Sequence, residues 1–319
     1  MIRVRSLVLF RAATSGTALA VSACSLQRWQ PAKASSLADD HAAHMQMSAP
    51  TGGALGLGST LASTQGIPGI PAGGTDAAAR LQASPRKGQF VAIPYEPGSR
   101  DSLMVWVTLP TSTAKASVVV VIHDNQGLST WARAVGDQLA ADGFIAIVPD
   151  LLSRVRGGAS SVELSRDSVG KLLGSLTRPD RQLGILAAAT YGMSLPTADK
   201  RYGVVGFCWG GGESFYHTIY SNKLGAAVVY YGTPPTKDSL VKVGAPILGL
   251  YGGTDARIGA TVPGTDSVMK DLKKFYEPHT FDGAGHGFLR SQDNPANVEA
   301  SKQAWPLTVA FLRKQLAAK

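Results

Sequence analysis

Cysteine is almost absent from this chain, which has only Cys24 and Cys208 among its 319 residues. Two cysteines cannot form a disulfide framework, and they are too far apart in sequence for a CxxC metal site. A Lys/Arg block is also missing, although 31 basic against 22 acidic residues give a net charge of +9. Scattered basic residues do not provide the basic stripe of a nucleic-acid-binding protein. We therefore expect neither a metal ion nor a nucleic acid partner.

Aromatic residues are absent between residues 31 and 87, a stretch that contains Gly52-Gly53 and Gly73-Gly74. A segment of this composition buries too little apolar surface to form a core. The sequence therefore predicts a flexible linker over residues 31–86 that is dispensable for folding and catalysis. Short helical turns near residues 75–81 are compatible with this interpretation.

Long apolar runs are missing as well, except for residues 7–23, which follow Arg3 and Arg5 and are interrupted by Arg11. A charged start followed by an apolar stretch is typical of an export signal. The tetrapeptide 21–24 (VSAC) resembles a bacterial lipobox with Cys24 as the lipidated residue, and residues 18–20 also fit an ordinary signal peptidase. We expect residues 1–30 to direct export to the periplasm or, as a lipoprotein signal, to the membrane surface.

Apolar runs alternate with helix-like stretches from residue 87 to the end. Residues 118–122 (VVVVI) and 144–148 (FIAIV) have the continuous apolar pattern of strands buried on both faces. Alternation of strands and helices predicts a mostly parallel α/β sheet, and residues 90–94 and 102–109 predict an N-terminal hairpin. The other expected strands are 204–207, 226–231, 247–251 and 276–281; the expected helices are 131–141, 162–173, 179–191, a stretch after Cys208, 269–275 and 297–316.

The pentapeptide 206–210 (GFCWG) lies between an expected strand and an expected helix. A nucleophile flanked by small residues at such a junction is a nucleophile elbow, here with Cys208 in place of the usual serine. The helix amides and dipole favour a thiolate and a developing oxyanion. The alternative is a buried structural cysteine beside a glycine-rich turn.

Two further loops bring an acid and a base to the same edge. Asp255 follows the expected strand 247–251, and the carboxyl ends of parallel strands form the active edge of such a sheet. His286 follows the last expected strand and is flanked by Gly285 and Gly287. The order nucleophile, acid, histidine is that of α/β-hydrolases. An Asx turn for Asp255 and a structural role for His286 are the alternatives.

Together, several motifs resemble the dienelactone hydrolase family from about residue 88 to the C-terminus. They are residues 122–128 (IHDNQGL), 148–151 (VPDL), 204–211 (VVGFCWGG), 252–255 (GGTD) and 285–288 (GHGF). This resemblance implies an α/β-hydrolase fold over residues 87–319, a triad of Cys208, Asp255 and His286, and no cofactor. It also implies an oxyanion hole formed by the backbone amides of Asn125 and Trp209.

The sequence departs from the family at Asp124, where glutamate is common and is thought to govern the protonation of the thiol. Aspartate keeps the charge on a shorter side chain, so we expect Asp124 to influence the ionisation of Cys208 or, alternatively, to cap its loop. Arg290, four residues after His286, matches a family position that can hold a substrate carboxylate. Arg154, Arg156 and Arg166 are further candidates, and each of these arginines has a solvated surface role as its alternative.

Aromatic residues offer candidates for an apolar substrate pocket. Trp131, Trp209 and Phe288 lie near the expected site loops, although core packing is an equally common role for such residues. The sequence as a whole predicts hydrolysis of a small ester or lactone through an acyl-enzyme on Cys208. The alternatives are a broad carboxylesterase, an acyltransferase that passes the acyl group to an alcohol or amine, and a catalytically weak binding protein of the cell envelope.

Overall fold

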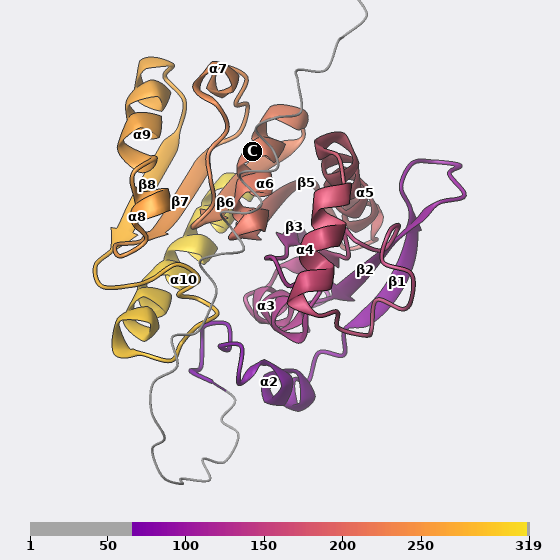
Figure 1. Ribbon diagram of the computed structural model, residues 1–319. Coiled ribbons are helices and arrows are strands. Elements are labelled where there is room, and N and C mark those ends of the chain that lie inside the picture. The colour runs from indigo at the N-terminus through magenta and orange to yellow at the C-terminus, as the bar shows by residue number, and fades with distance from the viewer. Residues whose placement is uncertain (1–65, 318–319) are drawn as a thin grey trace, which may run out of the picture.

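An eight-stranded sheet forms the centre of the computed structural model, which describes residues 66–317 (Figure 1). In spatial order the strands are β1 (Gln89–Pro94), β2 (Ser102–Thr108), β4 (Ile145–Pro149), β3 (Ala116–Ile122), β5 (Ala198–Phe207), β6 (Leu224–Tyr230), β7 (Ile247–Gly252) and β8 (Tyr276–Phe281). The pairs β1–β2 and β2–β4 are antiparallel, and the remaining pairs are parallel. The predicted α/β sheet with its N-terminal hairpin is confirmed.

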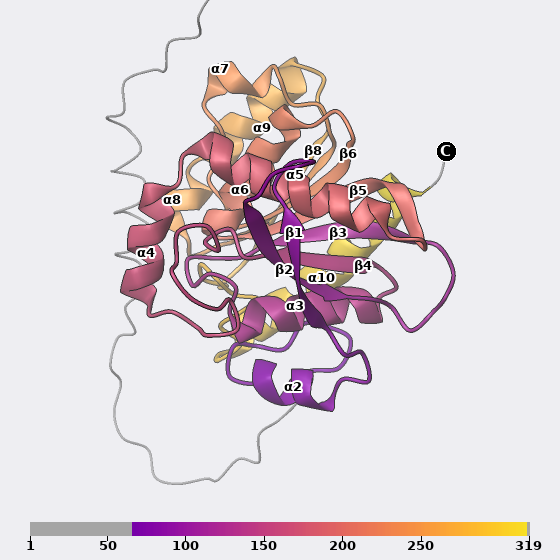
Figure 2. The same cartoon turned by 90° about the vertical axis from the view of Figure 1, so that its right-hand side faces the viewer.

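Helices cover both faces of the sheet, as the two layers in Figure 2 show. One layer contains α4 (Arg166–Ser175), α5 (Arg178–Ser194), α6 (Trp209–Tyr220) and α9 (Val262–Asp271). The other contains α2 (Ala77–Ala83), α3 (Thr130–Ala141) and α10 (Pro295–Leu316), while α7 (Lys237–Leu240) and α8 (Ala256–Gly259) are single turns. Strand β3 serves both layers, because Val118 and Val120 pack in the first core and Val119 and Val121 in the second.

Two predicted helices differ most from the structure, and local capping explains where the first begins and where the second ends. The helix expected from residue 162 begins at Arg166, because the Ser165 side chain accepts from the Ser168 amide and caps the helix there. The helix expected over 269–275 is wrong, since α9 ends at Asp271. Lys273 has a φ of 53°, and the Lys274 amide donates to the Met269 carbonyl over 2.9 Å, which is a Schellman-type helix end.

The prediction of a flexible linker is wrong for residues 66–86, which we call the N-terminal segment. Ile70, Ala72 and Ala77 in this segment are buried, and α2 packs on α3 (Figure 1). Arg86 forms an ion pair of 3.0 Å with the buried Asp137 of α3. Small aliphatic residues supply little core by themselves, but the folded domain provides the surface against which they pack. Residues 31–65 and the export signal expected at 1–30 lie outside the described residues.

Residues 109–115 connect β2 to β3 at the amino edge of the parallel strands. All of these residues except Pro110 are exposed. Both the nucleophile turn and the loops expected to carry the acid and the histidine follow strand carboxyl ends, at the opposite edge. Within residues 66–317, no helix is both long and apolar enough to cross a membrane.

Candidate active site

Cys208 lies in the sharp turn between β5 and α6, with φ 55° and ψ −115°. The residues two positions before and two positions after Cys208 must be glycine, because a Cβ at Gly206 would lie 2.0 Å from the Gly210 carbonyl oxygen. A Cβ at Gly210 would in turn lie 2.3 Å from the His123 carbonyl oxygen. The structure therefore contains the turn that the motif predicts, and it places the 7% exposed Cys208 at the N-terminus of a helix.

His286 and Asp255 come from adjacent loops, after β8 and β7. The His286 Nδ1 is 2.6 Å from the Asp255 Oδ2, and Asp255 is almost fully buried. The other carboxylate oxygen accepts from the Ile258 amide over 3.3 Å, which fixes the carboxylate at the start of α8. A Cβ at Gly252 would lie 2.6 Å from the Gly285 carbonyl oxygen, so the two loops are in close contact.

The Cys208 thiol completes this arrangement through a hydrogen bond with His286. Burial lowers the pKa of His286, but its hydrogen bonds to Asp255 and Cys208 and the charges of both partners outweigh burial and raise the pKa to about 9. Burial raises the pKa of Asp255, yet the hydrogen bond and the charge of His286 bring it below its usual value. The site thus favours an imidazolium between two acidic partners.

Trp209, the first residue of α6, is held from two sides. Its ring stacks on His123 with centroids 5.5 Å apart and an interplanar angle of 14°. The guanidinium of Arg181 lies 5.5 Å from the same ring system and pairs with the buried Glu213 over 2.8 Å. The backbone amide of Trp209 belongs to the first turn of the helix, where amides have no partner inside the helix.

Asp124 and Asn125 follow β3 directly, beside the nucleophile turn. One Asp124 oxygen accepts from the Gln126 amide over 2.9 Å, and the other accepts from Arg290 over 2.8 Å. The geometry therefore contains the loop-capping role, and the Asp124 charge helps to raise the pKa of Tyr231. The Asn125 side-chain nitrogen is buried and has no partner among the described residues.

The predicted substrate residues lie in different environments. Arg290 is partly buried, donates to Asp124 and Gln126, and lies 5.2 Å from the Trp131 ring. Trp131 and Phe288 are fully buried, with exposures of 1% and 0%. Both pack in the core beneath the site, so the structure does not give them a surface that a substrate could contact. Their burial corrects the substrate-lining role expected for them.

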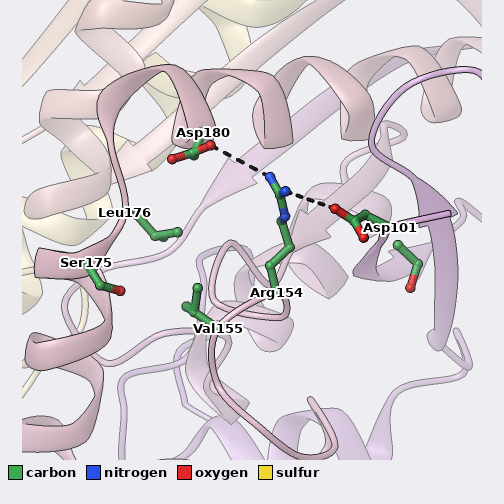
Figure 3. A pocket seen from close by; sticks show the side chains of 7 residues that line it. Asp101, Arg154, Val155, Ser175, Leu176 and Asp180 are labelled. Carbon is green, nitrogen blue, oxygen red and sulfur yellow. Dashed lines mark hydrogen bonds and ion pairs between the residues drawn. The ribbon is translucent and has the colours of Figure 1, made fainter. Parts of the chain in front are cut away.

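Of the other candidate arginines, Arg166 is exposed at the first position of α4, and Arg154 and Arg156 already have carboxylate partners. Arg154 pairs with Asp101 over 2.9 Å and Asp180 over 3.7 Å across a surface cavity of about 420 Å³ (Figure 3). Arg156 pairs with the buried Asp150 over 2.5 Å. These two guanidinium groups are neutralised within the protein, which makes them poor receptors for a substrate carboxylate.

Tyr231 is a site residue that the sequence motifs did not reveal. It follows β6, has a left-handed φ of 40° and is 1% exposed, and its ring lies 5.0 Å from the His286 ring. Burial, followed by the charges of Asp124 and Cys208, raises its pKa well above the usual value. Its hydroxyl has no partner among the described residues. Only the following Gly232, whose lack of a side chain lets the loop approach the Gly211 backbone, could have pointed to it.

A sequence model of the Dienelactone hydrolase family matches residues 103–316, which span every site loop described above. The chain belongs to the dienelactone hydrolase family. This membership confirms the resemblance seen in the sequence. It also indicates that the chain is an ester or lactone hydrolase. The match begins in β2, after the N-terminal segment.

Individual relatives of the dienelactone hydrolase family agree with this placement. A "Putative carboxymethylenebutenolidase" of Saccharolobus solfataricus is 27% identical over 246 residues, covering 67% of this chain and 95% of the relative. Another of the same name from Salmonella typhimurium is 28% identical over 228 residues, covering 66% and 82%. The crystal structure of a "Putative Dienelactone Hydrolase" from Klebsiella pneumoniae has a TM-score of 0.64 at 23% identity, over 72% of this chain and 99% of that one, which shows a shared fold.

Proposed function

We propose that this protein hydrolyses a small ester or lactone, with Cys208 as the nucleophile and His286 and Asp255 as its partners. The observation that carries this proposal is the continuous hydrogen-bonded arrangement of the three side chains at the carboxyl edge of the sheet. With a pKa of about 9, His286 carries a proton near neutral pH, which it can give to a leaving group beside Cys208. The thiolate, and not the thiol, is the nucleophile, so the reacting form of Cys208 is its anion.

The reaction follows from this charge distribution. The Cys208 thiolate attacks the substrate carbonyl carbon, and the backbone amides of Asn125 and Trp209 stabilise the oxyanion. His286 gives its proton to the leaving alkoxide as the C–O bond breaks, which leaves a thioester on Cys208 and a neutral imidazole. That imidazole takes a proton from water, whose hydroxide attacks the thioester and releases the carboxylic acid. Asp255 keeps the imidazole in the required orientation and tautomer.

A lactone differs from an open ester in the fate of the alkoxide. The alkoxide of a lactone stays attached to the acyl group, so hydrolysis yields one ring-opened acid instead of an acid and an alcohol. Arg290 is the residue we propose to meet a carboxylate on the substrate. Because Asp124 already binds this guanidinium, an anionic substrate must share or displace that carboxylate.

The test is hydrolysis of an aryl ester and a dienelactone by the full chain and by Cys208→Ala. We expect Cys208→Ala to lose about 10³-fold or more in kcat while keeping a cooperative thermal transition. Cys208→Ser, the conservative variant, should keep little activity, because the serine hydroxyl does not ionise beside the imidazole. If iodoacetamide labels Cys208 completely, as mapped by mass spectrometry, and hydrolysis continues at the original rate, the proposed mechanism is wrong.

A further inference from the structure

Residues 71–74 of the N-terminal segment lie against the loop that follows His286. The Gly74 amide donates to the Arg290 carbonyl oxygen over 2.8 Å, and the Gln292 side chain donates to the Pro71 carbonyl oxygen over 2.9 Å. A Cβ at Gly73 would lie 3.2 Å from the Gln292 Cβ, so the two stretches of backbone are closely apposed. The Arg290 backbone and the Gln292 side chain, on either side of Ser291, are thus tied to the segment.

The same stretch also reaches the Arg290 side chain, through Trp131. The Trp131 indole N–H donates to the Ala72 carbonyl oxygen over 3.1 Å. The Arg290 guanidinium lies 5.2 Å from the ring of this tryptophan, within the range of a cation–π interaction. Residues 71–74 therefore fix the backbone of Arg290 directly and the position of its side chain through one intermediate.

Arg290 in turn connects this stretch to the site. Its guanidinium donates to Asp124 over 2.8 Å, and the exposures of the two side chains are only 21% and 8%. Asp124 precedes Asn125, whose backbone amide we assign to the oxyanion hole. A small displacement of Arg290 would change both the balance of charge at Asp124 and the position of this loop, and displacements of about 1 Å can change rates by about 10²-fold.

We propose that residues 71–74 are a positioning element of the active site and act through the Arg290 side chain. This proposal rests on the proposed function for its catalytic consequence. It assigns a role to a part of the chain that lies outside the family match at 103–316 and that the composition alone predicts to be a dispensable linker.

A double-mutant cycle on the full-length chain tests the proposal. Gly74→Pro removes the amide that donates to the Arg290 carbonyl, and Arg290→Ala removes the guanidinium. We expect Gly74→Pro to lower kcat/KM for an aryl ester by about tenfold in the wild-type background. In the Arg290→Ala background it should have less than about a twofold effect, because the side chain through which it acts is gone. An equal loss in both backgrounds, or no loss in either, would overturn the proposal.

Two further variants separate positioning from stability. Gln292→Ala is a milder change that removes the donor to Pro71. It should lower kcat/KM a few-fold in the wild-type background and have a smaller effect in the Arg290→Ala background. This variant replaces Gly74→Pro if Gly74→Pro does not fold. Arg86→Gln is the matched control, since it breaks the contact of the same segment with Asp137 on α3. It should lower the melting temperature, leave kcat/KM within about twofold and combine additively with Arg290→Ala.

The rate of Cys208 alkylation by iodoacetamide provides a readout that needs no turnover. If the wild-type protein hydrolyses neither substrate, the proposed function fails, and the cycle is then measured on the alkylation rate. Non-additivity of Gly74→Pro and Arg290→Ala in that rate supports the positioning element, and additivity overturns it.

Discussion

The nucleophile turn at residues 206–210 and the N-terminal segment at residues 66–86 both contain closely packed glycines and both lie next to the site. In the turn, the close contacts run to its own backbone and to that of β3, and they tolerate no side chain. In the segment, the groups that hold it belong to distant elements such as Trp131 and Asp137. A short motif can specify the first kind of structure, whereas only the assembled fold specifies the second.

The first comparison concerns Asp255, which lies in a loop beside the nucleophile turn, and it should give the largest change in kcat/KM of the variants that follow. Asp255→Asn removes the charge that helps to raise the pKa of His286 to about 9 and should lower kcat/KM by about 10²–10⁴-fold. In the wild type, kcat/KM should fall as pH rises through about 9, because the leaving alkoxide loses its proton donor. This upper limb should move to lower pH in Asp255→Asn. The exposed Asp282, changed to Asn as a control, should keep the wild-type profile.

The free energy of unfolding should also depend on pH through the ionisation of His286. A histidine whose pKa is raised by folding adds stability that is complete below its ordinary value of 6.5 and is lost as pH rises through about 9. The difference in unfolding free energy between wild type and Asp255→Asn should therefore shrink across that interval. A difference that does not vary with pH would mean that Asp255 does not act on a charged His286.

Gly210→Ala tests whether the nucleophile turn requires a residue without a side chain at position 210. A Cβ 2.3 Å from the His123 carbonyl oxygen forces the backbone apart, so we expect a loss of about 3 kcal/mol or more in unfolding free energy, measured by urea denaturation. Gly264→Ala in α9 is the matched control, because nothing lies within 4 Å of its Cβ position. That control should be neutral or stabilising by up to about 1 kcal/mol.

Ile70→Ala tests whether the N-terminal segment belongs to the folded core. Ile70 is 4% exposed, and its truncation should cost about 2 kcal/mol of unfolding free energy, at the low end for buried isoleucines. Ile67, which is only partly buried, should cost less when changed in the same way. Equal melting temperatures for wild type and Ile70→Ala would show that the segment contributes nothing to the fold.

The smallest effect is expected at Asp124. Replacing this carboxylate with asparagine removes an anion near Cys208, and an anion opposes the ionisation of a thiol. Iodoacetamide should therefore inactivate Asp124→Asn a few-fold faster than wild type at neutral pH, while Asp124→Glu keeps the charge. Superimposable rate profiles against pH for the three proteins would show that Asp124 serves its contacts with Gln126 and Arg290 and does not act on the thiol.

The strand segments along the chain and the positions of the site loops follow from the sequence because local patterns decide them. The run 118–122 has the pattern of a doubly buried strand, and the glycines around Cys208 have the pattern of a sharp turn; the structure contains both. The Arg290–Asp124 pair and the burial of Trp131 could not be predicted, since they depend on loops far apart in the chain. Lys273 ends α9 in a conformation that lysine rarely adopts, so composition gave no sign of it.

The exposed connection at residues 109–115 has a practical consequence for handling the protein. It lies at the edge of the sheet opposite the site loops, and exposed loop tips tolerate insertion better than other positions. A peptide tag inserted there would let the protein be attached to a solid support with its substrate-facing edge directed away from the support.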